Sequence, residues 1–181
     1  MKDKRFYLKF SFFILILFVL NSPAEGIEAL LLKAEIKPIK GNPAAPLFNL
    51  EDLNGKKVSL KQYRDQVVFL NFWATWCGPC KEEMPSMEAL YQKFKESRFV
   101  FLTISVDYEE KKIVKEFIHK HRYTFPVLID SKCKALDLYG VKGIPTTILI
   151  DKKGRMIGRA IGPKDWKHPE IENILIQLIG K

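Results

Sequence analysis

Two almost wholly apolar runs lie in the middle of the chain. Residues 67–73 and 99–106 are rich in β-forming side chains and are bounded by polar residues. Such runs are typical of strands that are buried on both faces of a sheet. The pattern predicts further strands at 125–129, 146–150 and 155–161, the last two joined by a Gly-containing turn.

Apolar residues at helical spacing predict several helices. After residue 80 they recur at positions 84, 87, 90, 91 and 94, which would place them on one helix face. Pro85 lies within this helix, removes one backbone donor and should kink it. Further helices are expected at 109–121, 132–139 and 170–179.

A β-hairpin is predicted ahead of these elements. Residues 46–50 and 57–60 are extended in pattern and flank Leu53-Asn54-Gly55-Lys56. Asn-Gly favours a tight hairpin turn because both residues tolerate positive φ. Strands and helices then alternate along the chain, so the sequence predicts an α/β fold with a central mixed sheet.

The first 24 residues are predicted to be a signal peptide or an N-terminal anchor. A basic start precedes the apolar run 10–20, and Ser22-Pro23-Ala24 offers small residues at a cleavage site. The run is about half the ~20 residues that a membrane-spanning helix needs, which favours a cleaved signal. In either case the domain is exported, to the periplasm or to the outer face of the cytoplasmic membrane, where the N-terminus could associate with the membrane. Residues 25–42 show no clear period and are expected to be a spacer with a short added strand, ahead of a domain at 43–181.

The net charge of +9 does not change this picture. Basic residues occur as separated pairs at 56–57, 111–112 and 152–153, which is typical of solvated turns and helix faces. No dense basic stripe with interleaved aromatic residues occurs, so nucleic acid is not expected as a partner.

The candidate chemistry lies in Cys77-Gly78-Pro79-Cys80, directly after the first apolar run. A Cys-x-x-Cys pair can hold half a zinc site, attach haem, form a structural disulfide or exchange disulfides. Zinc would need further ligands that Cys133 and the three histidines do not supply, and haem attachment would need His where Lys81 stands. A structural disulfide across so short a loop would add little stability. Redox exchange without metal or cofactor is favoured, since a sulfur at a helix N-terminus is stabilised as thiolate.

The segment from Asn71 to Pro85, together with Gly143-Ile144-Pro145-Thr146-Thr147, resembles the thioredoxin superfamily. It most resembles the exported TlpA/ResA-like thiol–disulfide oxidoreductases, which contain a redoxin or AhpC/TSA-like domain. The resemblance covers about residues 43–181. It implies a thioredoxin fold with an N-terminal β-hairpin and an inserted helix–strand unit at 109–129.

The resemblance also implies roles for individual residues. Cys77 would attack a substrate disulfide, and Cys80 would resolve the mixed disulfide. Ile144-Pro145 matches the family's cis-proline loop, which faces the cysteine pair, and the Ile144 backbone could pair with an extended substrate segment. Gly78-Pro79 is the dipeptide of reducing thioredoxins and favours a reductant.

Three more positions near the pair have both a functional and a purely structural interpretation. Glu83 follows Cys80 by three residues on the same helix face and could tune the cysteines and move a proton, or be a solvated glutamate. Asn71 stands where cytoplasmic thioredoxins carry a buried Asp, and it could simply be a buried amide. Trp76 could contact substrate, although core packing is the default for it and for Trp73.

The expected activity is reduction of protein disulfides by dithiol–disulfide exchange. In the resembling family one common client is the Cys-x-x-Cys-His disulfide of apocytochrome c, and electrons would come from a membrane thiol–disulfide carrier. An oxidase of the same fold is the main alternative. A thiol peroxidase is less favoured because Ala74 stands where those enzymes need Thr. A copper carrier is less favoured because it spaces its cysteines by three residues and adds a distant His, for which His168 is the weak candidate.

Overall fold

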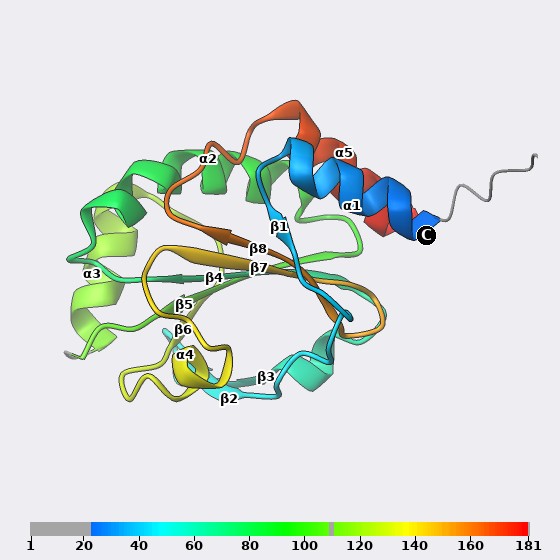
Figure 1. Cartoon of the computed structure of the whole chain (residues 1–181). Coiled ribbons are helices and arrows are strands. Elements are labelled where there is room, and N and C mark those ends of the chain that lie inside the picture. The colour runs from blue at the N-terminus through cyan, green and yellow to red at the C-terminus, as the bar shows by residue number, and fades with distance from the viewer. Residues whose placement is uncertain (1–22, 109–110, 181) are drawn as a thin grey trace, which may run out of the picture.

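A computed structural model describes residues 23–108 and 111–180, and their core is one mixed β-sheet (Figure 1). The sheet has eight strands in the order β1-β8-β7-β4-β5-β6-β2-β3. The strands are β1 Lys37–Pro38, β2 Asn49–Asp52, β3 Lys57–Ser59, β4 Val67–Trp73, β5 Phe99–Ser105, β6 Val127–Ile129, β7 Thr146–Ile150 and β8 Met156–Ile161.

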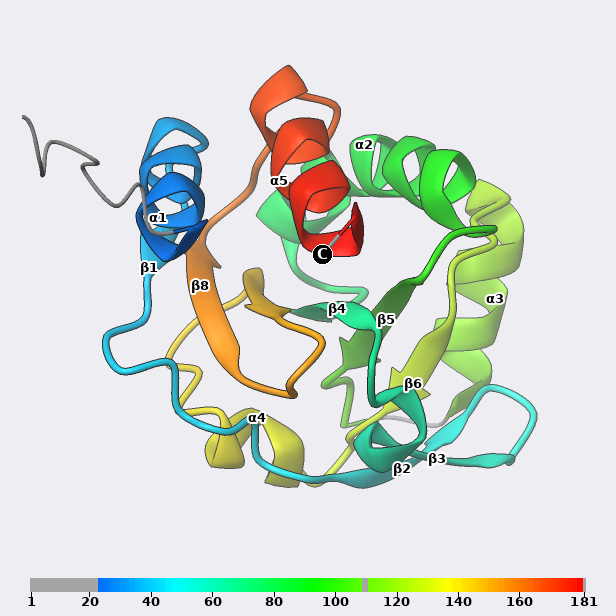
Figure 2. The same cartoon turned by 90° about the vertical axis from the view of Figure 1, so that its right-hand side faces the viewer.

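Helices cover both faces of this sheet. Figures 1 and 2 show α1, α2 and α5 on one side of the sheet and α4 on the other, with α3 beside the end of α2. A short 3-10 helix, η1, follows the hairpin. The helices are α1 Pro23–Lys33, η1 Leu60–Tyr63, α2 Gly78–Phe94, α3 Lys111–His121, α4 Lys134–Leu138 and α5 Pro169–Gly180.

Strand β4 lies at the centre, and every one of its residues is buried. It runs parallel to β5 and antiparallel to β7. Side chains alternate between the two faces of a strand, and β4 follows this rule. The ring centroids of Phe69 and Trp166, near α5, are 4.7 Å apart. On the other face, the ring centroids of Phe72 and Tyr139, beside α4, are 5.6 Å apart. Strand β4 is therefore packed on both of its faces ahead of the loop that follows it.

The predicted fold class is confirmed by the topology. Each segment predicted as a strand overlaps one: β4 and β7 have the predicted bounds, and the ends of the others differ by up to three residues. The hairpin pairs β2 with β3 across the Asn54-Gly55 turn, and Gly55 has φ 83°. The helix–strand unit is present as α3 and β6, although residues 109–110 of that prediction lie outside the described residues.

Residues 25–42 differ from the expectation of a spacer, because they contain most of helix α1 as well as the expected strand, β1. The side chains of Ile27 and Leu31 are buried one helical turn apart. Neighbouring leucines at 30 and 32 obscure that spacing in the sequence. Helix α1 lies beside α5 (Figure 2). Packing against α5 stabilises a helix that the hydrophobic pattern of the sequence does not predict. The domain limits at residues 24 and 42 remain predictions.

The predicted signal or anchor falls almost entirely outside the described residues. Among residues 23–108 and 111–180, no helix is both long enough and apolar enough to cross a membrane.

Candidate active site

Cys77 and Cys80 form a disulfide at the start of α2, with an S–S distance of 2.04 Å and a Cα–Cα distance of 5.3 Å. Cys77 is the N-cap of α2, with extended backbone angles (φ −82°, ψ 107°). Its Sγ accepts a hydrogen bond from the Cys80 N–H at 3.2 Å. Pro79 lies in the first turn, where its missing N–H costs nothing. The first sulfur therefore lies where free N–H groups and the helix dipole favour negative charge.

The two sulfurs differ in depth. The side chain of Cys80 is completely buried, while Cys77 retains 6% exposure. Trp76, immediately before the pair, is 61% exposed, so the default expectation of core packing is wrong for this residue. Trp73 is fully buried, as that default predicts.

The Ile144–Pro145 loop lies against the disulfide. The peptide bond before Pro145 is cis, as the resemblance implied. The carbonyl oxygen of Ile144 is 3.8 Å from the Cys77 Sγ. On the other side of the loop, the Gly162 N–H donates to the Pro145 carbonyl oxygen at 2.9 Å, which ties the loop to the end of β8. The structure thus brings the two sequence motifs together.

Glu83 is the buried acid of this site, and the interpretation as a solvated glutamate is wrong. The residue is only 2% exposed. Its Oε1 accepts a hydrogen bond from Asn71 Nδ2 at 2.8 Å. Its Oε2 accepts from the Lys164 N–H at 3.2 Å and from the Trp166 Nε1–H at 3.0 Å. Three donors from two separate parts of the chain, strand β4 and the loop before α5, converge on one carboxylate.

Burial dominates the titration of this carboxyl group. Desolvation raises the pKa of Glu83 from 4.5 to about 7, although the hydrogen bonds from Trp166, Asn71 and Lys164 act in the opposite direction. A carboxyl with a pKa near neutrality can both take up and release a proton at working pH. Its neighbour on the helix, Glu82, is exposed.

Asn71 connects this acid to the sheet. Its Nδ2 donates to Glu83 and also to the Thr147 hydroxyl at 2.9 Å. Its Oδ1 finds no hydrogen-bond partner within the described part of the chain. Both hydrogen bonds of the Asn71 side-chain amide among the described residues therefore go to buried side chains, and none goes to a backbone group.

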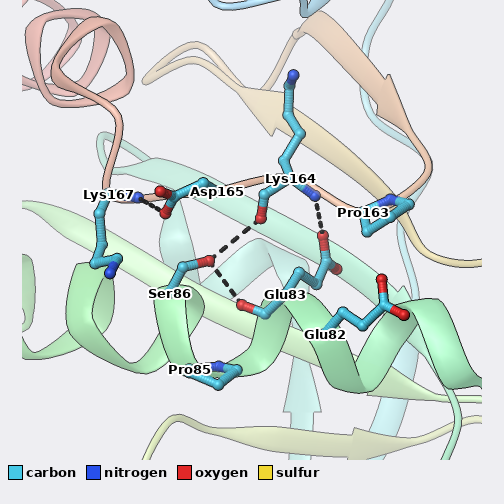
Figure 3. Close-up of a pocket in the computed structure, with 8 residues that line it drawn as sticks. All are labelled: Glu82, Glu83, Pro85, Ser86, Pro163, Lys164, Asp165 and Lys167. Atoms are coloured by element: carbon cyan, nitrogen blue, oxygen red, sulfur yellow. Dashed lines mark hydrogen bonds between the residues drawn. The ribbon is translucent and has the colours of Figure 1, made fainter.

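The loop before α5 completes the surroundings of Glu83, and sequence reasoning missed it. Figure 3 shows the Lys164 backbone facing α2, where the Ser86 hydroxyl oxygen lies 2.7 Å from the Glu83 carbonyl oxygen and 3.2 Å from that of Lys164. Beside these groups lies a pocket of about 390 Å³ that Glu83 and Lys164 help to line. Trp166 lies 83 residues from its partner Glu83 in the sequence. Nothing in the local pattern around residues 163–167 indicates this contact.

A disulfide at the start of a helix, next to a cis-proline and on a mixed sheet with this strand order, defines a thiol–disulfide oxidoreductase of the thioredoxin fold. The chain belongs to the AhpC/TSA family, whose model matches residues 42–158. It is 45% identical over 118 residues to a thiol–disulfide oxidoreductase ResA of Bacillus anthracis. The aligned region covers 65% of this chain and 68% of that protein. With ResA of Bacillus subtilis it shares 42% identity over 113 residues, or 62% of this chain and 63% of that protein.

Solved structures agree with these relatives. A putative thiol:disulfide interchange protein DsbE from Chlorobium tepidum aligns with a TM-score of 0.70 and 32% identity, over 77% of this chain and 97% of the other. StoA from Bacillus subtilis aligns with a TM-score of 0.59 and 30% identity, over 67% of this chain and 92% of StoA. The resemblance found in the sequence is therefore confirmed, and thiol–disulfide oxidoreductase activity follows from the relatives and the Cys77–Cys80 pair together.

Proposed function

We propose that the protein works outside the cytoplasm as a reductant of protein disulfides, with Cys77 as the attacking and Cys80 as the resolving residue. Relatedness to ResA proteins indicates an extracytoplasmic location and protein disulfide substrates. The observation that carries the assignment of roles is the difference in depth between the two sulfurs. Only Cys77 retains exposure, whereas Cys80 is fully enclosed. An incoming disulfide can therefore reach Cys77 alone.

The exchange proceeds in two steps. The Cys77 thiolate attacks one sulfur of the substrate disulfide, and the other substrate sulfur leaves as a thiolate. The Cys80 thiolate then attacks the Cys77 Sγ, the substrate leaves with both sulfurs reduced, and the Cys77–Cys80 disulfide forms. Two electrons pass from the protein to the substrate, and a membrane thiol–disulfide carrier would return them.

Glu83 supplies the proton acceptor for the second step in this proposal. A buried Cys80 thiol must lose its proton before it can attack, and bulk water does not reach it. Glu83 follows one turn later on α2, and its pKa of about 7 suits proton transfer near neutral pH. Asn71, which carries no charge, cannot take this role.

Substrate recognition is assigned to the groups around Cys77. Trp76, the residue before Cys77, has an exposed aromatic side chain, and the Ile144 carbonyl oxygen lies 3.8 Å from the Cys77 Sγ. An extended peptide could add its backbone hydrogen bonds at this loop. Apocytochrome c, with its Cys-x-x-Cys-His disulfide, is the client that the resemblance to the family favours.

A peroxidase function is not supported by the site. Peroxidases of this wider family need Thr three residues before the reactive Cys, and Ala74 is there, fully buried. The neighbouring Thr75 hydroxyl donates its hydrogen to Asp107. No hydroxyl from these two residues is free to hold a peroxide.

The reduction potential of the Cys77–Cys80 couple tests the direction of the reaction. A value near about −270 mV, as in thioredoxin, supports a reductant, and a value near about −120 mV supports an oxidase instead. Trapping tests the substrate class. The variant C80S should retain clients as mixed disulfides on Cys77, whereas C77S should retain none. Absence of any protein adduct on C80S in an oxidising extracytoplasmic extract would contradict the proposal.

A further inference from the structure

The loop between β4 and α2 carries Cys77, and its anchoring comes from a neighbouring strand. Residues 74–76 link the buried end of β4 to the helix. Within the loop, the Cys77 N–H donates to the Ala74 carbonyl oxygen at 3.2 Å, so Thr75 lies in the middle of a tight turn. A turn this short moves as a unit, and whatever holds Thr75 also fixes where Cys77 lies.

Asp107, two residues beyond the end of β5, holds Thr75 in place. The Thr75 N–H donates to both carboxylate oxygens of Asp107, at 3.0 and 3.2 Å. The Thr75 hydroxyl donates to Oδ1 at 2.5 Å. We infer that Asp107 is a positioning residue for disulfide exchange, because it holds Thr75 and thereby keeps the Cys77 sulfur at the N-terminus of α2.

The Asp107 carboxylate is also held by hydrogen bonds that do not involve the Cys77 loop. The Ser105 hydroxyl donates to Asp107 Oδ2 at 2.7 Å, and the Asp107 N–H lies 3.2 Å from the same hydroxyl oxygen. The Val106 N–H donates to the Trp73 carbonyl oxygen at 2.9 Å, so the ends of β4 and β5 are also joined through the backbone. Asp107 is only 3% exposed. A buried carboxylate with several donors is a rigid acceptor, and losing a donor is costly.

This contact acts most when the disulfide is open. In the oxidised protein the bond to Cys80 ties Cys77 to α2 covalently. In the reduced protein that tie is gone, and the position of Cys77 depends on the hydrogen bonds of its loop. If the loop drifts, the sulfur moves away from the helix N-terminus that stabilises its thiolate. The Asp107–Thr75 contact should therefore lower the pKa of the reduced Cys77 thiol.

Two substitutions of Thr75 separate this role from general stability. T75V removes the hydroxyl and keeps the side-chain shape, whereas T75S keeps the hydroxyl and should restore normal behaviour. The chain offers a matched control in Thr124, which donates its N–H and its hydroxyl to Glu88 at 2.8 and 2.6 Å, away from the disulfide. T124V loses an equivalent hydroxyl–carboxylate hydrogen bond without touching the loop. All variants carry C133S, so that only the pair reacts.

The measurement is the alkylation rate of Cys77 against pH in the fully reduced protein, together with the melting temperature. For T75V we expect a rise in the Cys77 pKa that lowers the alkylation rate at neutral pH by about tenfold, as loss of a hydrogen bond to a charged group implies. T75S and T124V should titrate like the parent protein.

A parent-like titration in T75V would overturn the inference, and so would an equal shift in T124V. The inference rests on disulfide exchange through Cys77, as proposed above. Titration of the thiol needs no client and no electron donor, so an error in the direction or client of the proposed function would leave its outcome unchanged.

Discussion

The indole Nε1–H of Trp166 donates a hydrogen bond of 3.0 Å to Oε2 of Glu83, and both residues are buried. This single contact joins helix α2, which carries the disulfide, to the segment that leads into α5. It also favours the ionised form of a carboxyl group that burial pushes toward the neutral form. The titration of the acid beside the cysteines therefore depends on a residue far away in the sequence.

Replacing Trp166 with Phe should raise the pKa of Glu83 further above its present value of about 7, because a donor to the ionised form is lost. The free energy of unfolding should fall by roughly 1–3 kcal/mol at alkaline pH, where the carboxylate would lack that partner. Carboxyl carbon NMR of Glu83 in the oxidised protein measures the pKa directly.

Trp73→Phe is the matched control. The Trp73 indole is equally buried, but its Nε1–H has no hydrogen-bond partner among the described residues. This variant loses the same atoms from another aromatic site and should leave the pKa of Glu83 unchanged. Equal shifts in both variants would show that packing, not the hydrogen bond, sets the titration.

Glu83 should also make the stability of the oxidised protein depend on pH. Its pKa is about 7 in the folded protein and near 4.5 in the unfolded chain, so the folded state holds the proton more tightly. The stabilisation that results is complete below about pH 4.5 and is lost as the pH rises through about 7. The loss amounts to about 3 kcal/mol.

Denaturant unfolding of the parent protein and of Glu83→Gln at several pH values measures this loss. The parent should lose about 3 kcal/mol relative to the variant between about pH 4 and pH 8. The disulfide must stay closed, so that the cysteines do not titrate. Parallel curves for the two proteins across this range would refute the prediction.

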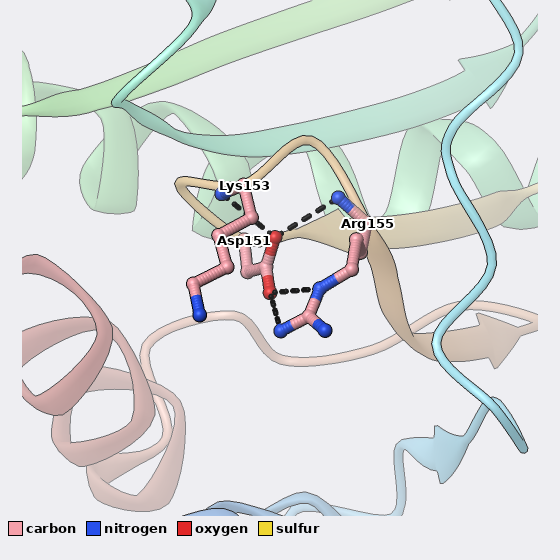
Figure 4. Close-up of polar contacts among 3 residues, drawn as sticks. All are labelled: Asp151, Lys153 and Arg155. Atoms are coloured by element: carbon pink, nitrogen blue, oxygen red, sulfur yellow. Dashed lines mark hydrogen bonds and ion pairs between the residues drawn. The ribbon is translucent and has the colours of Figure 1, made fainter.

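The sequence predicts the elements that depend on contacts between neighbouring residues, and it does not predict those that depend on contacts between distant segments. The turn between β7 and β8 could be predicted because its contacts are local: the Asp151 carboxylate accepts hydrogen bonds from the Lys153 and Arg155 N–H groups and from the Arg155 side chain (Figure 4). The buried strand β4 could be predicted because all of its residues face the interior. Helix α1 could not, because its order depends on packing against α5 and β8.

The same division applies to the site. Cys77, Cys80 and Pro145 lie in motifs, so spacing and resemblance identified them. Trp166 and Asp107 lie outside those motifs and act through contacts with residues that are distant in the chain. A helix position can show that Glu83 faces the same way as Cys80. It cannot show which residues bury the carboxylate, and this burial raises the pKa of Glu83.

In the reduced protein, Glu83→Gln should lower the apparent pKa of a cysteine in the pair. A nearby carboxylate disfavours a thiolate through like-charge repulsion, and the amide removes that charge. Ultraviolet absorbance of the thiolate against pH measures the change. Glu82→Gln is the control, since Glu82 is the exposed neighbour on the same helix. An unchanged thiolate titration in Glu83→Gln would remove Glu83 from the mechanism.

Gly158 in β8 should be essential for seating the N-terminal segment. A Cβ at this position would lie 2.8 Å from the Cγ2 of Ile36 and 3.0 Å from a Cδ of Leu31, closer than side chains can pack. Gly158→Ala should therefore displace α1 or β1 and lower the free energy of unfolding by about 1–3 kcal/mol. Gly26→Ala is the matched control within α1, because nothing lies within 4 Å of its added Cβ. Alanine favours a helix over glycine, so this control should keep or slightly raise stability. Equal stability of the two variants in denaturant unfolding would show that α1 and β1 are held loosely, and that the close packing on β8 does not stabilise the fold.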